Sequence, residues 1–136
     1  MNYRVVSNSH QPTILTIGND RTELAFNSTL LASFELVYAT FEKQTLSWIQ
    51  QHQPDLIVLD LEASQQLLSL IATLKLDWLT RDIPILAIAN SAAQQLRRPA
   101  DLDCDACLIR PYSTVELEQK LNSLLPSFNR IHHQAV

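Results

Sequence analysis

The sequence predicts an α/β fold in three layers, a doubly wound parallel sheet of five strands with helices on both faces. Two observations predict it. Short runs rich in Leu, Ile and Val recur along the chain, and runs without polar alternation are typical of strands buried on both faces of a parallel sheet. Segments of about 10–15 residues with helical periodicity separate these runs, which is the spacing of β-α-β units with right-handed connections.

Five runs are the expected strands: Thr13–Ile17, Leu36–Thr40, Pro54–Leu61, Ile83–Ala89 and Ala106–Ile109. The central run, PDLIVLDL, holds an unbroken apolar stretch between Asp55 and Asp60. In open α/β sheets, ligands gather beyond the carboxyl ends of the strands, near the point where the strand order reverses. Asp60, at such an end, is therefore the first candidate for a functional residue.

Helices are expected between the strands and after the last one: Asp20–Phe34, Glu42–His52, a third from about Leu67 to Trp78, a short one at Ser91–Leu96 and a final one at Ser113–Leu125. Asp20 with Glu23, and Ser113 with Glu116, have the spacing of a capping box. In the third helix, apolar residues recur at i, i+3, i+4 and i+7: Leu67, Leu70, Ile71 and Leu74.

Length and composition favour one globular domain. The 136 residues divide into an arm at 1–12, a domain at 13–125 and a tail at 126–136. The net charge of −4, with Lys and Arg mostly isolated in the sequence, excludes a basic face for nucleic acid. We find neither a signal peptide nor a membrane-spanning run, and we expect a cytoplasmic protein that does not bind membranes.

Gly18 is the only glycine of the chain and directly follows the first expected strand. Glycine permits positive φ and also a close approach of other groups to the backbone. Gly18 therefore predicts a turn that needs one or the other.

The order of elements, with Asp60 ending the third strand and Arg110-Pro111-Tyr112 ending the fifth, resembles the receiver domains of bacterial response regulators. The resemblance covers roughly Thr13 to Leu125 and implies a flavodoxin-like topology with strand order 2-1-3-4-5. It also implies a phosphorylation site at the carboxyl edge of the sheet. Such a site has two acids after the first strand, a phosphate-accepting Asp after the third, Thr or Ser after the fourth, and Lys-Pro after the fifth.

Matched to the family pattern, Asp60 falls on the phosphoacceptor and Pro111 on the proline, which in the family is often in a cis bond. Arg110 replaces the lysine. Gly18 and Asn19 fall on the acidic pair.

Two more family positions differ. Ala89 falls on the Thr or Ser after the fourth strand, and Cys107 falls on the aromatic residue of the fifth strand. The segment Leu61-Glu62-Ala63-Ser64 also lacks the family's usual Met-Pro. As a result the sequence predicts the receiver fold more strongly than it predicts phosphorylation.

These replacements matter because phosphoryl transfer to a carboxylate requires a cation, and Mg²⁺ prefers carboxylate ligands. Without acids at Gly18 and Asn19, the remaining metal ligands are Asp60 and Asp20, and Asp20 could instead cap a helix. Arg110 could form a planar pair with Asp60 and so replace both metal and lysine, or could simply be solvated at a strand end.

Cys104 and Cys107 form a C-x-x-C pattern, which is typical of redox pairs and of zinc sites. These cysteines precede a strand and lie among aspartates, which disfavours a reactive thiolate, and zinc would need the adjacent His132 and His133. We expect both thiols to be reduced and Cys107 to be at least partly buried.

Three functional hypotheses remain. The leading one is a stand-alone, atypical receiver-like module that signals by contacts with a histidine kinase or downstream regulator, without enzymatic activity or a cofactor. The second is a working phosphoacceptor, with Mg²⁺ bound by Asp60 and Asp20, and the third is a small redox or ligand-binding protein of flavodoxin-like shape. In the leading hypothesis, the partner contacts the usual output face of receivers: Gln94, Gln95, Cys107, Glu118 and Gln119.

Overall fold

The computed structural model describes residues 4–5, 11–19, 33–90 and 104–125. Several expected features lie outside these residues: the first helix with its Asp20 cap, the short helix carrying Gln94 and Gln95, and the tail at 126–136 with His132 and His133. Within the described part of the chain, no helix has the length and apolar character needed to cross a bilayer.

Six strands form one sheet in the order β1-β3-β2-β4-β5-β6. The five longer strands are mutually parallel and are β2 (Thr13–Ile17), β3 (Glu35–Ala39), β4 (Leu56–Asp60), β5 (Ile85–Ala89) and β6 (Ala106–Ile109). Numbered by themselves along the chain, these strands lie in the order 2-1-3-4-5, and the predicted topology is confirmed. Their carboxyl ends therefore meet at one edge of the sheet.

β1 (Arg4–Val5) is an addition that the sequence did not indicate. It pairs antiparallel with β3, with Arg4 opposite Tyr38 and Val5 opposite Val37. Part of the arm at 1–12 therefore belongs to the sheet. Without β1, β3 would be an edge strand with unpaired backbone groups along one side, and a short antiparallel strand satisfies some of them.

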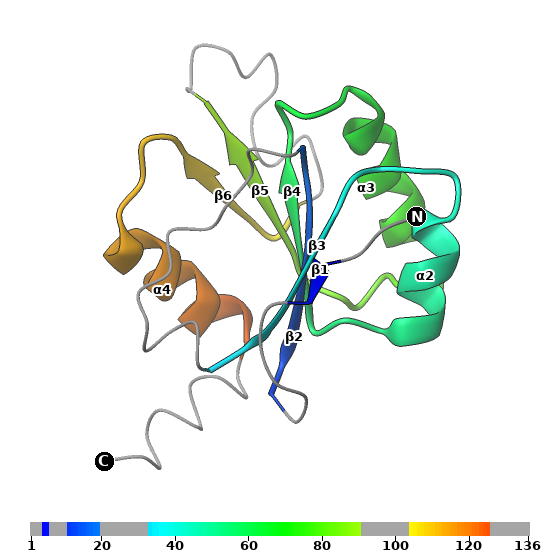
Figure 1. Cartoon of the computed structure of the whole chain (residues 1–136), viewed down its shortest axis with the longest axis horizontal. Coiled ribbons are helices and arrows are strands. Elements are labelled where there is room, and N and C mark those ends of the chain that lie inside the picture. The colour runs from blue at the N-terminus through cyan, green and yellow to red at the C-terminus, as the bar shows by residue number, and fades with distance from the viewer. Residues whose placement is uncertain (1–3, 6–10, 20–32, 91–103, 126–136) are drawn as a thin grey trace.

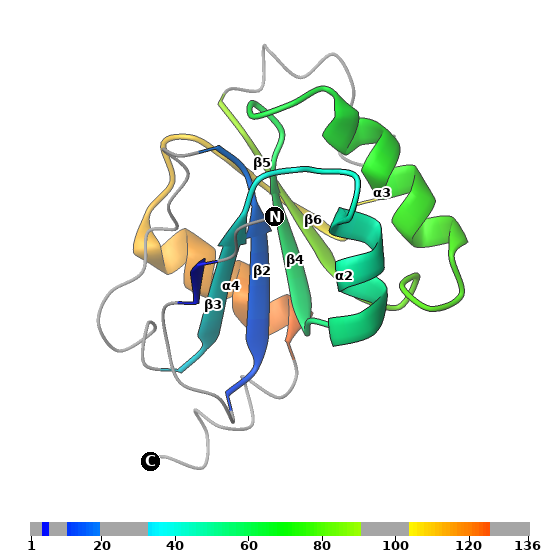
Figure 2. The same ribbon diagram turned by 45° about the vertical axis from the view of Figure 1, so that its right-hand side comes forward.

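The helices cover both faces of the sheet (Figures 1 and 2). α2 (Thr45–His52) and α3 (Gln66–Leu76) lie on one face, and α4 (Thr114–Leu124) lies on the other. α3 buries all four apolar residues of its predicted face, and α4 buries Leu117 and Leu121. The described elements thus form the three layers expected from the sequence.

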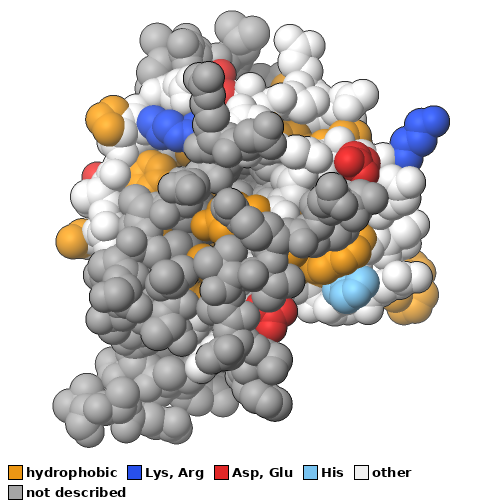
Figure 3. All heavy atoms as spheres, in the orientation of Figure 1, with side chains coloured by type: hydrophobic (Ala, Val, Ile, Leu, Met, Phe, Trp, Pro, Cys, Tyr) orange, Lys and Arg blue, Asp and Glu red, His pale blue; other side chains and the backbone are white. Residues whose placement is uncertain are grey.

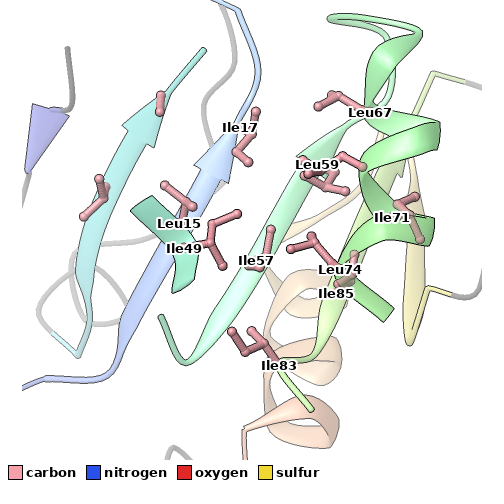
Figure 4. Packing of buried hydrophobic residues seen from close by; sticks show 13 residues of the cluster. Leu15, Ile17, Ile49, Ile57, Leu59, Leu67, Ile71, Leu74, Ile83 and Ile85 are labelled. Carbon is pink, nitrogen blue, oxygen red and sulfur yellow. The ribbon is translucent and has the colours of Figure 1, made fainter. Parts of the chain in front are cut away.

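Two apolar clusters fill the space between the layers because successive residues of a strand point to opposite faces. On the α4 side the cluster includes Ile14, Leu56, Val58, Leu86, Ile88, Leu108, Leu117 and Leu121. The cluster under α2 and α3 includes Leu15, Ile17, Ile49, Ile57, Leu59, Leu67, Ile71 and Leu74, and Figure 4 shows it from close by. β4 is buried along its whole length, as expected for a central strand of a parallel sheet.

Some boundaries differ from the expected ones for local reasons. α2 begins at Thr45 rather than Glu42, because the Thr45 hydroxyl accepts a hydrogen bond from the Glu42 N–H at 2.9 Å and Glu42 leads into a turn. β5 begins at Ile85, after the proline that cannot donate to the sheet. Phe34 is fully buried but lies in the bend before β3, so it does not belong to a helix as the sequence predicts.

The capping box at the start of α4 is confirmed. Ser113 Oγ accepts the Glu116 N–H at 3.1 Å, and Glu116 Oε1 accepts the Ser113 N–H at 3.3 Å. These bonds satisfy two N–H groups that the first turn leaves without helical partners. The cap fixes where α4 begins, just after the segment that carries Arg110.

Candidate functional site

Asp60 and Arg110 end two strands that are not neighbours. Asp60 is the last residue of β4, and Arg110 directly follows β6, with β5 lying between the two. The Arg110 N–H donates to the Ala89 carbonyl at 2.8 Å and so continues the pairing with β5 beyond its last residue. From this anchored position, the long Arg110 side chain reaches across the end of β5 to the carboxylate of Asp60.

The two side chains form a double hydrogen bond. Nη1 of Arg110 donates to Oδ1 of Asp60 at 3.1 Å, and Nη2 donates to Oδ2 at 3.0 Å. The Asp60 side chain is 5% exposed and that of Arg110 is 29% exposed. The structure therefore has the planar pair rather than a solvated arginine. Hydrogen bonding to Asp60 raises the pKa of the Arg110 guanidinium, which stays charged.

Two further residues complete a closed set of hydrogen bonds, which we call the Arg110 network: Asp60, Glu62, Asn90 and Arg110. The Glu62 N–H donates to Oδ1 of Asp60 at 3.1 Å. Nη1 of Arg110 also donates to Oδ1 of Asn90 at 3.0 Å, and the Asn90 N–H contacts Oε1 of Glu62 at 3.4 Å. The network joins the segments that follow β4, β5 and β6.

The sequence did not single out Asn90 as a site residue, and it drew attention to Glu62 only as a departure from the family pattern. A signal was present for both. Each lies within two residues of a strand's carboxyl end, where the side chains of a parallel sheet converge. Their role in the network could not be predicted without knowing the direction of the Arg110 guanidinium.

The remaining predicted residues of this region are arranged as follows. The Arg110–Pro111 peptide bond is cis, and Pro111 is exposed. Ala89 is 2% exposed at the end of β5 and brings no hydroxyl to the site. Asp20 lies outside the described residues, and within the described ones no three His, Cys, Asp or Glu side chains gather as metal ligands would.

A separate hollow lies at the other half of the same edge, and we call it the β2–β3 hollow. It has a volume of about 240 Å³. Its lining comes from the ends of β2 and β3 and from the start of α3: Ile17, Gly18, Asn19, Thr40, Phe41, Ala63, Ser64 and Leu67. Gly18 is buried and Asn19 is exposed. The φ of Gly18 is not positive. Of the two reasons proposed for this glycine, the one that remains is a close approach of other groups to its backbone.

The predicted output face is described only in part, because Gln94 and Gln95 lie outside the described residues. Cys107 is half-buried in β6, Glu118 is half-buried on α4, and Gln119 is exposed on the same helix. Glu118 and Gln119 belong to α4, whereas Cys107 alternates with Leu108 of the α4-side cluster and so faces the other side of β6, the strand at the edge of the sheet.

Neither Cys104 nor Cys107 forms a disulfide bond. Burial raises the pKa of the Cys104 thiol, and the neighbouring Cys107 raises it further. A raised pKa leaves less of the reactive thiolate at neutral pH. Cys107 is half-buried, as predicted.

Comparisons with solved structures agree on the fold. CheY4, the chemotaxis response regulator of Vibrio cholerae, matches with a TM-score of 0.69 and 16% identity over 85% of this chain and 99% of its own. A sensor protein from Polaromonas sp. JS666 matches with a TM-score of 0.67 and 24% identity, over 86% and 98% of the two chains.

A response regulator receiver modulated diguanylate cyclase from Pelobacter carbinolicus matches with a TM-score of 0.64 and 22% identity, over 89% and 97%. No protein-family model matches the sequence, and neither does any curated protein. The chain has the fold of response-regulator receiver domains. At these identities, the likeness establishes the fold and leaves the function to the residues of the site.

Proposed function

We propose that the chain is an atypical receiver module of two-component or phosphorelay signalling that acts by contacts with a protein partner. In this proposal Asp60 is held by Arg110 and is not the acceptor of a phosphoryl group. The observation that carries the proposal is the double hydrogen bond from the Arg110 guanidinium to a carboxylate that is 5% exposed.

The chemistry of phosphoryl transfer supports this view. To attack phosphorus, a carboxylate oxygen needs to be nucleophilic and to have a nearby cation that neutralises the transferring oxygens. Arg110 donates to both oxygens of Asp60, and Oδ1 also accepts the Glu62 N–H, so these fixed donors make the carboxylate a weaker nucleophile. The guanidinium provides the compensating positive charge without a metal.

The neutral residues at the family's acidic positions also support the proposal. Gly18 and Asn19 directly follow β2 and bring no carboxylate, and Mg²⁺ binds weakly where carboxylates are few. The same edge lacks the hydroxyl that Ala89 replaces. In our proposal the missing acids and hydroxyl are explained by Arg110, because a fixed cation at Asp60 makes a metal site unnecessary.

We further propose that the partner binds at the β6 edge of the sheet, at a surface that includes Cys107 on β6 and Glu118 and Gln119 on α4. The partner class is a histidine kinase or a downstream regulator. Nucleic acid is a poor candidate, because the net charge is −4 and the Lys and Arg side chains coloured in Figure 3 stand apart rather than forming a basic field.

A capture experiment tests this function. The protein is immobilised as wild type, Asp60→Asn, Glu118→Arg and, as a control on the other face of the sheet, Lys43→Glu. Bound proteins from a lysate of the source cells are then identified by mass spectrometry. We expect the same partner with wild type, Asp60→Asn and Lys43→Glu, and its loss with Glu118→Arg. A partner retained only after treatment with a phosphodonor, and lost with Asp60→Asn, would instead support the phosphoacceptor hypothesis.

A further inference from the structure

The β2–β3 hollow differs from the Arg110 network in having no charged side chain in its lining. Ile17, Phe41, Ala63 and Leu67 provide apolar surface, and the polar side chains are those of Asn19, Thr40 and Ser64. Figure 4 shows Ile17 and Leu67 at the same end of the sheet, to which β2 points. Apolar walls with a few polar groups are typical of small-molecule sites, and a neutral lining disfavours ions.

Gly18 adds an independent reason to regard the hollow as a site. The chain contains one glycine, and that glycine is buried at the wall of the hollow. Its φ is not positive, so the backbone at this position is open to any residue. The Gly18 N–H donates to the Ala39 carbonyl at 2.9 Å, as a residue that continues the sheet would do. The property that remains specific to glycine is the space left by the missing side chain.

The position of the hollow in the topology is a third reason. β3 lies on one side of β2, whereas β4, β5 and β6 follow on the other, so the strand order reverses between β2 and β4. The hollow is lined by the ends of β2 and β3 and by the segment after β4. In open α/β sheets, the crevice at this reversal is where ligands bind.

We propose that the β2–β3 hollow binds a small neutral compound with a heteroaromatic ring, such as a nucleobase. The volume of about 240 Å³ corresponds to roughly eight waters at ~30 Å³ each, which suits one or two rings rather than a nucleotide. The lining includes one aromatic ring, that of Phe41, and three side chains that can hydrogen-bond, those of Asn19, Thr40 and Ser64, which is the combination that a heteroaromatic ring requires. The site is independent of whether Asp60 accepts a phosphoryl group.

The test is a titration of the ¹⁵N-labelled protein with adenine, followed by amide chemical shifts. Benzoate and benzamidine are the anionic and cationic comparison rings. We expect saturable shifts with adenine that centre on Gly18, Asn19 and Ser64, and weaker or no shifts with the two charged rings. Absence of saturable shifts up to the solubility limit of adenine, or stronger binding of either charged ring, would overturn the proposal.

A pair of variants places the binding at the hollow. Thr40 is exposed at its rim, so Thr40→Trp obstructs the hollow with little risk to the fold, while Ser123→Trp makes the same change at an exposed position of α4. We expect Thr40→Trp to weaken adenine binding at least tenfold and Ser123→Trp to leave it unchanged. Equal affinities of the two variants would show that adenine binds elsewhere, and the proposal would be wrong.

Discussion

The two halves of the sheet's carboxyl edge use opposite chemistry. On the β4–β6 side, a buried carboxylate is satisfied by a guanidinium, a backbone N–H and their neighbours. On the β2–β3 side, the lining is uncharged and leaves a hollow of about 240 Å³. In the receiver family these positions together form one cation-dependent site. In our proposal, Arg110 neutralises Asp60, so that the end of β2 needs no acids and can bind a neutral compound instead.

The largest effect should come from removing the cation of the charged half. Arg110→Met leaves the Asp60 carboxylate, whose side chain is 5% exposed, without its countercharge. Breaking a buried pair in this way costs about 3–5 kcal/mol, and the partial exposure of Arg110 favours the lower end of that range. We expect the free energy of unfolding, measured by urea denaturation, to fall by about 3 kcal/mol.

The matched control for this change is Arg81→Met, at an arginine that is exposed after α3. Surface substitutions of this kind usually change stability by less than ~0.5 kcal/mol. Equal losses for the two variants would remove the Arg110–Asp60 pair as a source of stability.

A smaller effect separates two substitutions of Asp60. Asp60→Asn keeps an oxygen that can accept from Arg110, whereas Asp60→Ala leaves the guanidinium without that partner. We expect the free energy of unfolding of Asp60→Ala to be about 1–3 kcal/mol lower than that of Asp60→Asn. Thermal and urea unfolding of the pair measure the difference. If the two variants are equally stable, hydrogen bonding to Arg110 does not hold this edge together.

In the neutral half, Gly18→Ala should have a still smaller effect on folding. Since the φ of Gly18 is not positive, alanine fits the backbone, and its methyl group enters a region next to the hollow. We expect a change in unfolding free energy within about 1 kcal/mol, measured by urea denaturation. A loss as large as that of Arg110→Met would mean that Gly18 is required for packing, which would weaken the contrast between the two halves.

The smallest effect lies outside both halves, at Cys104. Burial raises the pKa of this thiol above its ordinary value, so the folded state disfavours the thiolate. The associated stability is present below the ordinary thiol pKa and is lost as pH rises through the raised one. We expect iodoacetamide to label Cys104 more slowly than a model thiol at pH 8, and the folded protein to lose a little stability above pH 9, an effect that Cys104→Ala should remove.

How much of the site the sequence reveals depends on which elements carry it. Asp60 and Arg110 follow buried strands whose apolar runs are easy to recognise, and the parallel topology brings such ends together. Their pairing was therefore open to prediction, although the sequence left a solvated Arg110 as an alternative. Asn90 belongs to the network because the guanidinium of Arg110 points toward it. A sequence pattern does not predict the direction of a side chain.

The hollow and β1 were out of reach for a different reason. The hollow is a space between residues that are unremarkable one by one, such as Thr40 and Ala63, and its existence depends on packing rather than on residue type. β1 is two residues long, and its pairing with β3 depends on the tertiary structure rather than on its own sequence. Periodicity needs longer segments than this to give a signal.

The central claim is that Asp60 pairs with Arg110 and does not accept a phosphoryl group. Its most direct test is intact mass spectrometry after incubation with acetyl phosphate and Mg²⁺. Wild type and Asp60→Asn are treated side by side, together with a receiver domain known to be phosphorylated as a positive control. The account predicts that neither form of this protein gains the mass of a phosphoryl group. Stoichiometric addition to wild type that is absent in Asp60→Asn would contradict it and establish Asp60 as a phosphoacceptor.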